Sequence, residues 1–147
     1  MVPRILIIDD RNNLPRFIAL ELNAKGYQVS IRAKYSVESW MIQVFRPDLI
    51  ILNWELRCQS GSDVYHHLKV THPQIPIIII TAKDENSDRV GLISEKQTCL
   101  TKPFSMSDLL IAIEYEFISR KQLTTCRRAN LGKRESISLS YYLNPSQ

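Results

Sequence analysis

Polar side chains with distinct chemistry stand directly after the apolar segments of this 147-residue chain. Asp9 and Asp10 follow the first such segment, Asn53 the third and Thr81 the fourth, while Lys102 closes the last. Paired carboxylates are oxygen ligands of the kind that hard divalent cations prefer. The set thus offers two carboxylates, a hydroxyl and an ammonium group. The amide of Asn53 is a poor nucleophile.

These residues need a scaffold that brings the segment ends together, and the apolar pattern predicts a parallel β-sheet. Leu49–Leu52 and Ile77–Ile80 are apolar at consecutive positions, which is typical of central strands that are covered on both faces. The expected strands are Ile5–Ile8, Tyr27–Ile31 at an edge, Leu49–Leu52, Ile77–Ile80 and a fifth that begins at Leu100. Stretches with helical spacing separate them. The pattern predicts a doubly wound α/β sheet of five βα units with strand order 2-1-3-4-5.

The first two helices are predicted from capping residues and apolar stripes. Asn12 or Asn13 can cap the first helix, and Gly26 stands where a left-handed residue would end it. Leu14, Ile18 and Leu22 share one face of this helix. Ser36 would cap the second helix, which Pro47 would stop. We expect its core-facing stripe to consist of Val37, Trp40, Met41, Val44 and Phe45.

Three further helices follow along the chain. Two are expected over Asp63–Val70 and Asp84–Ser94. The last begins at Ser105, where Asp108 can complete a capping box. Its apolar period fades beyond Ser119, so the residues that follow are predicted to form a linker.

Because the carboxyl ends of parallel strands lie at one edge of a sheet, the five polar residues should converge on one crevice. Their order and spacing resemble the receiver domain of bacterial two-component response regulators, a flavodoxin/CheY-like fold, over residues 3 to about 119. The resemblance implies that Asp9 and Asp10 hold a divalent cation and that position 53 carries the phosphoacceptor. It also implies that Thr81 senses the phosphoryl group and that Lys102, next to Pro103, pairs with the acidic cluster.

The chain departs from the family's pattern at several positions of this machinery. Asn53 replaces the phosphoacceptor aspartate, Cys99 replaces the aromatic switch residue, and Arg57 replaces a proline. Residues 95–98 replace the usual Gly-Ala-Asp-Asp run. Since these departures agree, a natural pseudo-receiver is favoured over an engineered exchange at position 53. We expect no phosphorylation there, weak or absent magnesium binding, and no other cofactor.

An amide at position 53 should also change the electrostatics of the crevice. Three carboxylates at close range repel one another, and Asn53 would remove two of the three pairwise repulsions. Its side chain could accept a hydrogen bond from Lys102 and donate one to Asp9 or Asp10. The hypothesis is therefore a locked cluster that needs no metal.

Charge and composition suggest how the chain is organised beyond the receiver. Residues 1–119 carry a net charge of −1, while residues 120–147 carry +5. We predict a receiver over 1–119, a basic linker over 120–136, and over 137–147 either the start of a truncated winged-helix domain or a disordered tail. Residues 137–146 resemble the short strands that open the winged-helix domain in the OmpR/PhoB branch of the family. Cys58, Cys99 and Cys126 are widely spaced, so neither a disulfide framework nor a zinc site is indicated.

Two functions remain open at this stage. The chain is either a receiver that regulates transcription through an attached or partner DNA-binding domain, or a stand-alone pseudo-receiver that binds other proteins. An enzyme is disfavoured, because no nucleophile is paired with a base. We expect a cytoplasmic protein with no membrane segment, with protein partners such as a kinase or another receiver, and with DNA contact only through a largely missing effector domain. Arg89 and Glu114 mark a possible dimer face, with a monomer or a non-standard dimer as the expected state.

Overall fold

A five-stranded parallel sheet positions the polar residues of the crevice. The computed structural model describes residues 1–36, 40–82 and 96–129, with the backbone alone described for 121–129. The strands run in the order β2-β1-β3-β4-β5. They are β1 (Arg4–Ile8), β2 (Gln28–Arg32), β3 (Leu49–Asn53), β4 (Ile77–Ala82) and β5 (Thr98–Lys102). The predicted fold class and strand order are confirmed.

Burial explains why these segments take central or edge positions. All five residues of β3 are buried, as are the first five residues of β4. β2 has no fully buried residue and lies at an edge of the sheet, as predicted. Consecutive apolar residues need cover on both faces, which only an interior strand receives.

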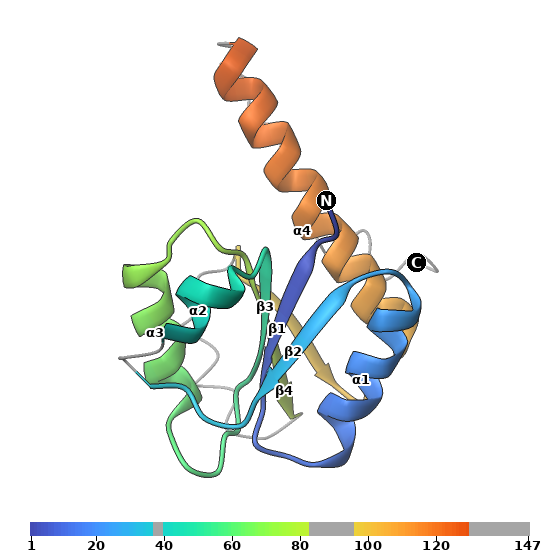
Figure 1. Ribbon diagram of the computed structural model, residues 1–147, viewed down its shortest axis with the longest axis vertical. Helices are drawn as coiled ribbons and strands as arrows, with labels where there is room; N and C mark the ends of the chain where they lie inside the picture. The colour runs from blue at the N-terminus through green and yellow to red at the C-terminus, as the bar shows by residue number, and fades with distance from the viewer. Residues whose placement is uncertain (37–39, 83–95, 130–147) are drawn as a thin grey trace. The chain divides into compact units, whose positions relative to one another are not determined.

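Helices supply that cover on both faces of the sheet. α1 (Asn13–Ala24) lies on one face, whereas α2 (Trp40–Phe45) and α3 (Gly61–Thr71) lie on the other (Figure 1). Ile18 and Leu22 of α1 are buried, as their spacing predicted. Asn12 stands at the N-cap, but its side chain makes no capping hydrogen bond. Gly26 has a φ of +96°, so the left-handed end of α1 is confirmed.

The predicted stripe of the second helix is wrong. Ile42 is the buried residue of α2, whereas Trp40 and Val44 are 64% and 67% exposed. Val37 lies outside the described residues. Five of the six residues of α2 are apolar, so periodicity alone could not fix which side of this short helix faces the sheet. Packing against the sheet fixed that choice.

The chain divides after Pro103 into two units, and α4 (Met106–Ala129) belongs to the second. Its start is the predicted capping box, because Asp108 N donates to Ser105 Oγ over 3.0 Å and Ser105 N donates to Asp108 Oδ2 over 3.1 Å. α4 continues through Ala129, beyond Ser119, and so includes the first residues of the predicted linker. Residues 120–129 hold no glycine or proline, so the backbone stays helical after the apolar stripe ends.

Two other expectations meet the limits of the described chain. The helix predicted over Asp84–Ser94 and the tail over 137–147 lie outside the described residues. The boundary between a receiver and a linker near residue 119 stays a prediction. Among the helices that are described, none combines the length and the apolar character that a membrane span requires.

Candidate functional site

The centre of the crevice is a hydrogen-bonded row of three side chains at the carboxyl ends of three strands. Asn53, the last residue of β3, donates from Nδ2 to Asp9 Oδ1 over 3.1 Å. Lys102, the last residue of β5, donates from Nζ to Asn53 Oδ1 over 3.4 Å. Asp9 Oδ1 also accepts from the backbone N–H of Arg11 over 2.9 Å. Both hydrogen bonds predicted for Asn53 are therefore present.

The side chains at the centre of this row are buried. Asn53 is 1% exposed and Asp9 is 4% exposed, so each polar atom needs a partner within the protein. The pKa of Lys102 is lowered chiefly by its burial and further by the charge of Arg11, while Glu55 and Asp9 act in the opposite direction. The hydrogen bond of the Lys102 ammonium group goes to the neutral amide oxygen of Asn53 and not to a carboxylate.

Asp10 is held by a different set of donors. Its Oδ2 accepts from the backbone N–H groups of Arg57 and Cys58, over 2.5 and 3.1 Å. These amides belong to the loop between β3 and α3. Asp10 Oδ1 is buried without a hydrogen-bond partner. Asp10 therefore fixes that loop more directly than it contributes to the row around Asn53.

The arrangement also bears on the divalent cation that the resemblance implies for Asp9 and Asp10. Asp9 Oδ1 already accepts two hydrogen bonds, and one oxygen of Asp10 accepts two more. Asn53 presents an N–H donor to Asp9 and contributes no negative charge. In the part of the chain that is described, no three His, Cys, Asp or Glu side chains gather as a metal site. Asp10 Oδ1 makes no hydrogen bond, so these contacts reduce the number of free ligand atoms without excluding a cation, and weak or absent magnesium binding stays a prediction.

Thr81 lies at the end of β4, where the sequence placed it, but its partner was not foreseen. Its hydroxyl donates to Glu55 Oε1 over 2.6 Å, and the backbone N–H of Ala82 donates to the same oxygen over 2.8 Å. Glu55 is an acid in a loop, and sequence reasoning treats such residues as solvated. The signal that could have found it is its place two residues after Asn53, in the loop that leaves the crevice edge.

The remaining predicted pocket residues do not join this network. Cys99 lies on β5, packs against the main apolar cluster, and has its thiol pKa raised to about 11 by burial. Pro103 follows Lys102 through a cis peptide bond and is exposed. Glu114 is exposed on α4, whereas Arg89 lies outside the described residues. The proposed dimer face of Arg89 and Glu114 therefore stays a prediction.

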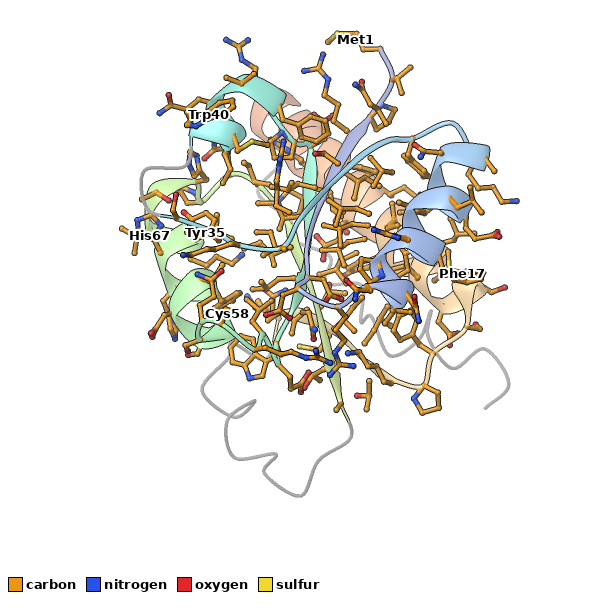
Figure 2. All side chains as sticks on the ribbon, turned by 60° about the horizontal axis from the view of Figure 1, so that its bottom comes forward. Met1, Phe17, Tyr35, Trp40, Cys58 and His67 are labelled. Atoms are coloured by element: carbon orange, nitrogen blue, oxygen red, sulfur yellow. The ribbon has the colours of Figure 1, made fainter. Side chains whose placement is uncertain are left out.

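A second network joins the loop before α2 to the loop before α3. Tyr35 N donates to Gln59 Oε1 and Gln59 Nε2 donates to Tyr35 O, each over 2.7 Å. The Tyr35 hydroxyl lies 2.5 Å from His67 Nδ1 on α3 (Figure 2). Cys58, in the same loop as Gln59, is exposed. His67 is thus partnered by a tyrosine.

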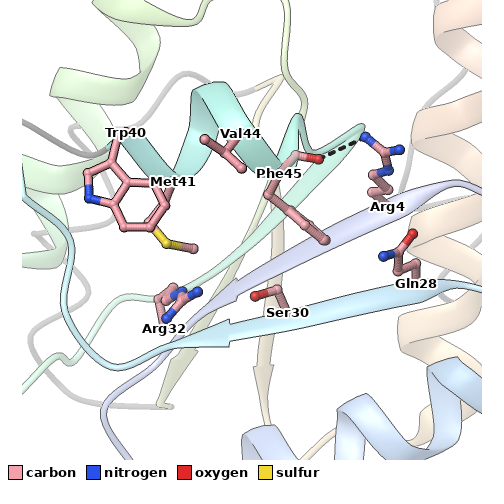
Figure 3. A pocket seen from close by; sticks show the side chains of 8 residues that line it. All are labelled: Arg4, Gln28, Ser30, Arg32, Trp40, Met41, Val44 and Phe45. Atoms are coloured by element: carbon pink, nitrogen blue, oxygen red, sulfur yellow. Dashed lines mark hydrogen bonds between the residues drawn. The ribbon is translucent and has the colours of Figure 1, made fainter.

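A separate pocket of about 310 Å³ lies between α2 and the β1–β2 edge of the sheet (Figure 3). Arg4, Arg32, Trp40 and Val44 are among the residues that line it. Arg4 Nη1 donates to the carbonyl of Phe45 over 3.1 Å and so closes one end. None of the predicted site residues lines this pocket.

A family model decides the identity of the fold and its crevice. The model described as "Response regulator receiver domain" matches residues 5–114. The chain belongs to the response regulator receiver family. The match spans the strands whose ends form the crevice, and the assignment of Asn53 to the phosphoacceptor position stays a prediction.

Curated relatives place this receiver beside OmpR/PhoB-type regulators. It is 33% identical over 118 residues to the phosphate regulon transcriptional regulatory protein PhoB of Escherichia coli, covering 78% of this chain and 51% of PhoB. It is 35% identical over 112 residues to the response regulator MprA of Mycobacterium bovis, covering 75% of this chain and 48% of MprA. The receiver spans about half the length of the curated relatives it matches.

Solved structures agree on the fold. A CheY-like response regulator receiver domain protein from Methanospirillum hungatei superimposes with a TM-score of 0.69 at 20% identity, covering 83% of this chain and 98% of that one. A receiver domain protein from Clostridium thermocellum gives a TM-score of 0.70 at 24% identity, covering 83% and 99%. At these identities the likeness shows the fold alone.

Proposed function

We propose that this chain is a receiver module that works without phosphorylation at position 53 and regulates transcription through an attached or partner DNA-binding domain. The observation that carries the proposal is the row formed by Asp9, Asn53 and Lys102. The amide of Asn53 occupies the acceptor position and satisfies both of its neighbours. A carboxamide is a poor phosphoryl acceptor, so input must reach the module by another route, such as a protein contact.

Relatives support the second half of the proposal. PhoB of Escherichia coli is named a transcriptional regulatory protein, and this chain matches about half of its length. We infer that a DNA-binding domain, in the same polypeptide or on a partner, completes the function in the cytoplasm. The receiver itself acts as a non-enzymatic signalling module whose partners are proteins.

The alternative is a stand-alone pseudo-receiver that binds a kinase or another receiver. Cys99 stands in place of the aromatic switch residue, and this favours the alternative. A receiver without that residue has a weaker means of passing a conformational change to an attached DNA-binding domain. Recovery of a kinase or another receiver in a pull-down with this chain would support the alternative. Transcriptional effects that require a DNA-binding domain would support the first proposal.

The decisive experiment is intact mass spectrometry after incubation with magnesium and acetyl phosphate. We expect the parent chain to stay unmodified and Asn53→Asp to gain the mass of one phosphoryl group. Asn23→Asp, an exposed change on α1, is the matched control and should stay unmodified. A phosphoryl gain by the parent chain would contradict the proposal, because another residue would then be the acceptor.

Oligomeric state is a further part of the proposal. We infer a monomer, or a dimer built from contacts other than the family's usual charged pairs, because Glu114 is exposed where basic residues are common. Light scattering of the parent and of Arg89→Glu tests this. A dimer in the parent that disappears in Arg89→Glu would restore the family's interface and contradict the inference.

A further inference from the structure

The carboxylate of Glu55 reaches across the crevice to the end of β4. Two donors converge on its Oε1, the hydroxyl of Thr81 over 2.6 Å and the backbone N–H of Ala82 over 2.8 Å. Thr81 is 6% exposed, so the contact is largely shielded from water. Hydrogen bonds to an ionised acceptor are shorter and stronger than neutral ones, and both distances are short. The pair of donors is therefore an anion site that a residue of the same chain fills.

The backbone of the loop aims Glu55 at this donor pair. Glu55 N donates to Asn53 Oδ1 over 3.3 Å, which fixes the start of the loop. Further along, the N–H groups of Arg57 and Cys58 are held by Asp10. A carboxylate tethered this closely acts at a high effective concentration, so an external anion must compete with it.

The surroundings show that the site is built for charge. Glu55 Oε2 is buried without a hydrogen-bond partner, and so is Nε of Arg11. The ammonium group of Lys102 interacts electrostatically with Glu55 as well as with Asp9. An acid on a solvated loop would have none of these features. The side chain of Glu55 therefore lies in the crevice and not in solvent.

We propose that Glu55 is a built-in anionic ligand of the Thr81–Ala82 donor pair, holding the β3–α3 loop to the end of β4 without any modification of the protein. This inference rests on the proposed function, because it supplies within the chain the anion that Asn53 cannot acquire by phosphorylation. The ligand class that the vacated site would take is a small oxyanion such as inorganic phosphate. Asn53 and Glu55 then act together. Asn53 prevents phosphorylation at position 53, and Glu55 supplies the anion that contacts Thr81 and Ala82.

The test is a titration with inorganic phosphate, followed through the backbone amide resonance of Ala82. In the parent chain the resonance should not respond, because Glu55 occupies the donors. In Glu55→Ala it should shift without phosphate and should then respond to phosphate at concentrations at least about tenfold below the highest one that leaves the parent unchanged. Glu21→Ala, which removes a half-buried glutamate from α1, is the matched control and should behave like the parent. Equal phosphate responses in the parent and in Glu55→Ala would overturn the inference.

A second measurement covers the case in which Glu55→Ala does not fold. Glu55→Gln keeps the size of the side chain but removes its charge, and Thr81→Val replaces the hydroxyl with a methyl group, so a double-mutant cycle in urea unfolding measures the coupling between that charge and the hydroxyl. We expect the two changes to be coupled by at least about fivefold in the unfolding equilibrium constant. Additive effects would overturn the inference. Phosphoryl gain by the parent chain in the mass experiment contradicts the proposed function instead, so the two failures are distinguishable.

Discussion

Asn53 and Asp9 are joined by a side-chain hydrogen bond of 3.1 Å, at a point where an aspartate in place of Asn53 would set two carboxylates side by side. The amide converts a repulsive pair into an attractive one. Asp9 is 4% exposed, so little water is available to screen a second charge at this position. The attraction between the two side chains therefore depends on one donor, Nδ2 of Asn53.

The first prediction follows from this pair. Asn53→Asp should lower the free energy of unfolding by about 1–3 kcal/mol in metal-free buffer, because it removes a buried hydrogen bond and adds a like charge. Magnesium should restore part of that loss, since a cation offsets the repulsion. Urea unfolding with and without magnesium measures both effects. The parent chain is the control, and an equal gain of stability from magnesium in the parent would contradict the prediction.

The second prediction concerns the pH dependence that Lys102 contributes. Its pKa is lowered in the folded chain, chiefly by burial, whereas the unfolded chain keeps the ordinary value of 10.5. Between these two values the unfolded state binds more protons, so stability should rise with pH across this window. Cys99 and Tyr65, whose pKa values are raised by burial, act in the opposite direction at alkaline pH.

The measurement for Lys102 is therefore a comparison of two chains. Urea unfolding of the parent and of Lys102→Met at several pH values below 10.5 gives the difference between their free energies of unfolding. That difference should move in favour of the parent as the pH rises. A difference that stays constant with pH would show that Lys102 titrates alike in the folded and unfolded chains.

The third prediction concerns Gly61, the first residue of α3. A Cβ atom there would lie 2.2 Å from the backbone oxygen of Trp54, so the loop that carries Glu55 would have to move. Gly61→Ala should lower the free energy of unfolding by about 3 kcal/mol. Gly26→Ala is the control, because its Cβ would meet open space and only the φ of +96° is unfavourable, at about 1–2 kcal/mol. Equal losses for the two glycine changes in urea unfolding would refute the steric argument.

The fourth prediction concerns thiol reactivity. The thiolate is the reactive form, and the pKa of Cys99 is raised to about 11, so Cys99 should react slowly at neutral pH. Cys58 is exposed and should react first. Labelling with a disulfide reagent in a Cys126→Ser background separates the two rates, and the rate at Cys99 should increase as the pH approaches 11. Labelling of Cys99 as fast as Cys58 at pH 7 would contradict this prediction.

The strands and the row around Asn53 could be predicted because their signals are local in sequence. Continuous apolar runs mark β3 and β4, and the polar residue that ends each strand lies at the same edge by geometry. The hydrogen bonds of Asn53 then followed from the donors and acceptors of its neighbours. This part of the crevice needs no information on loop conformation.

Features set by tertiary packing could not be predicted in the same way. α2 is apolar on nearly every side, so its buried residue, Ile42, depends on how the helix packs on the sheet. The role of Glu55 depends on the course of the loop between β3 and α3. Asp10 accepts hydrogen bonds from this loop, and Gly61 lets its backbone approach closely. A run without glycine or proline extends α4 to Ala129 although no apolar period marks it.

The two tryptophans of the chain make the crevice observable by light. Trp54 directly follows Asn53, is 8% exposed, and packs edge-on to Tyr65 with ring centroids 6.0 Å apart. Trp40 is largely in water on α2. A soluble quencher should therefore quench the emission of Trp40 first, and Trp40→Phe leaves Trp54, beside the residue that ends β3, as the single tryptophan. Any partner or anion that disturbs the crevice then becomes visible as a change in emission, without a label.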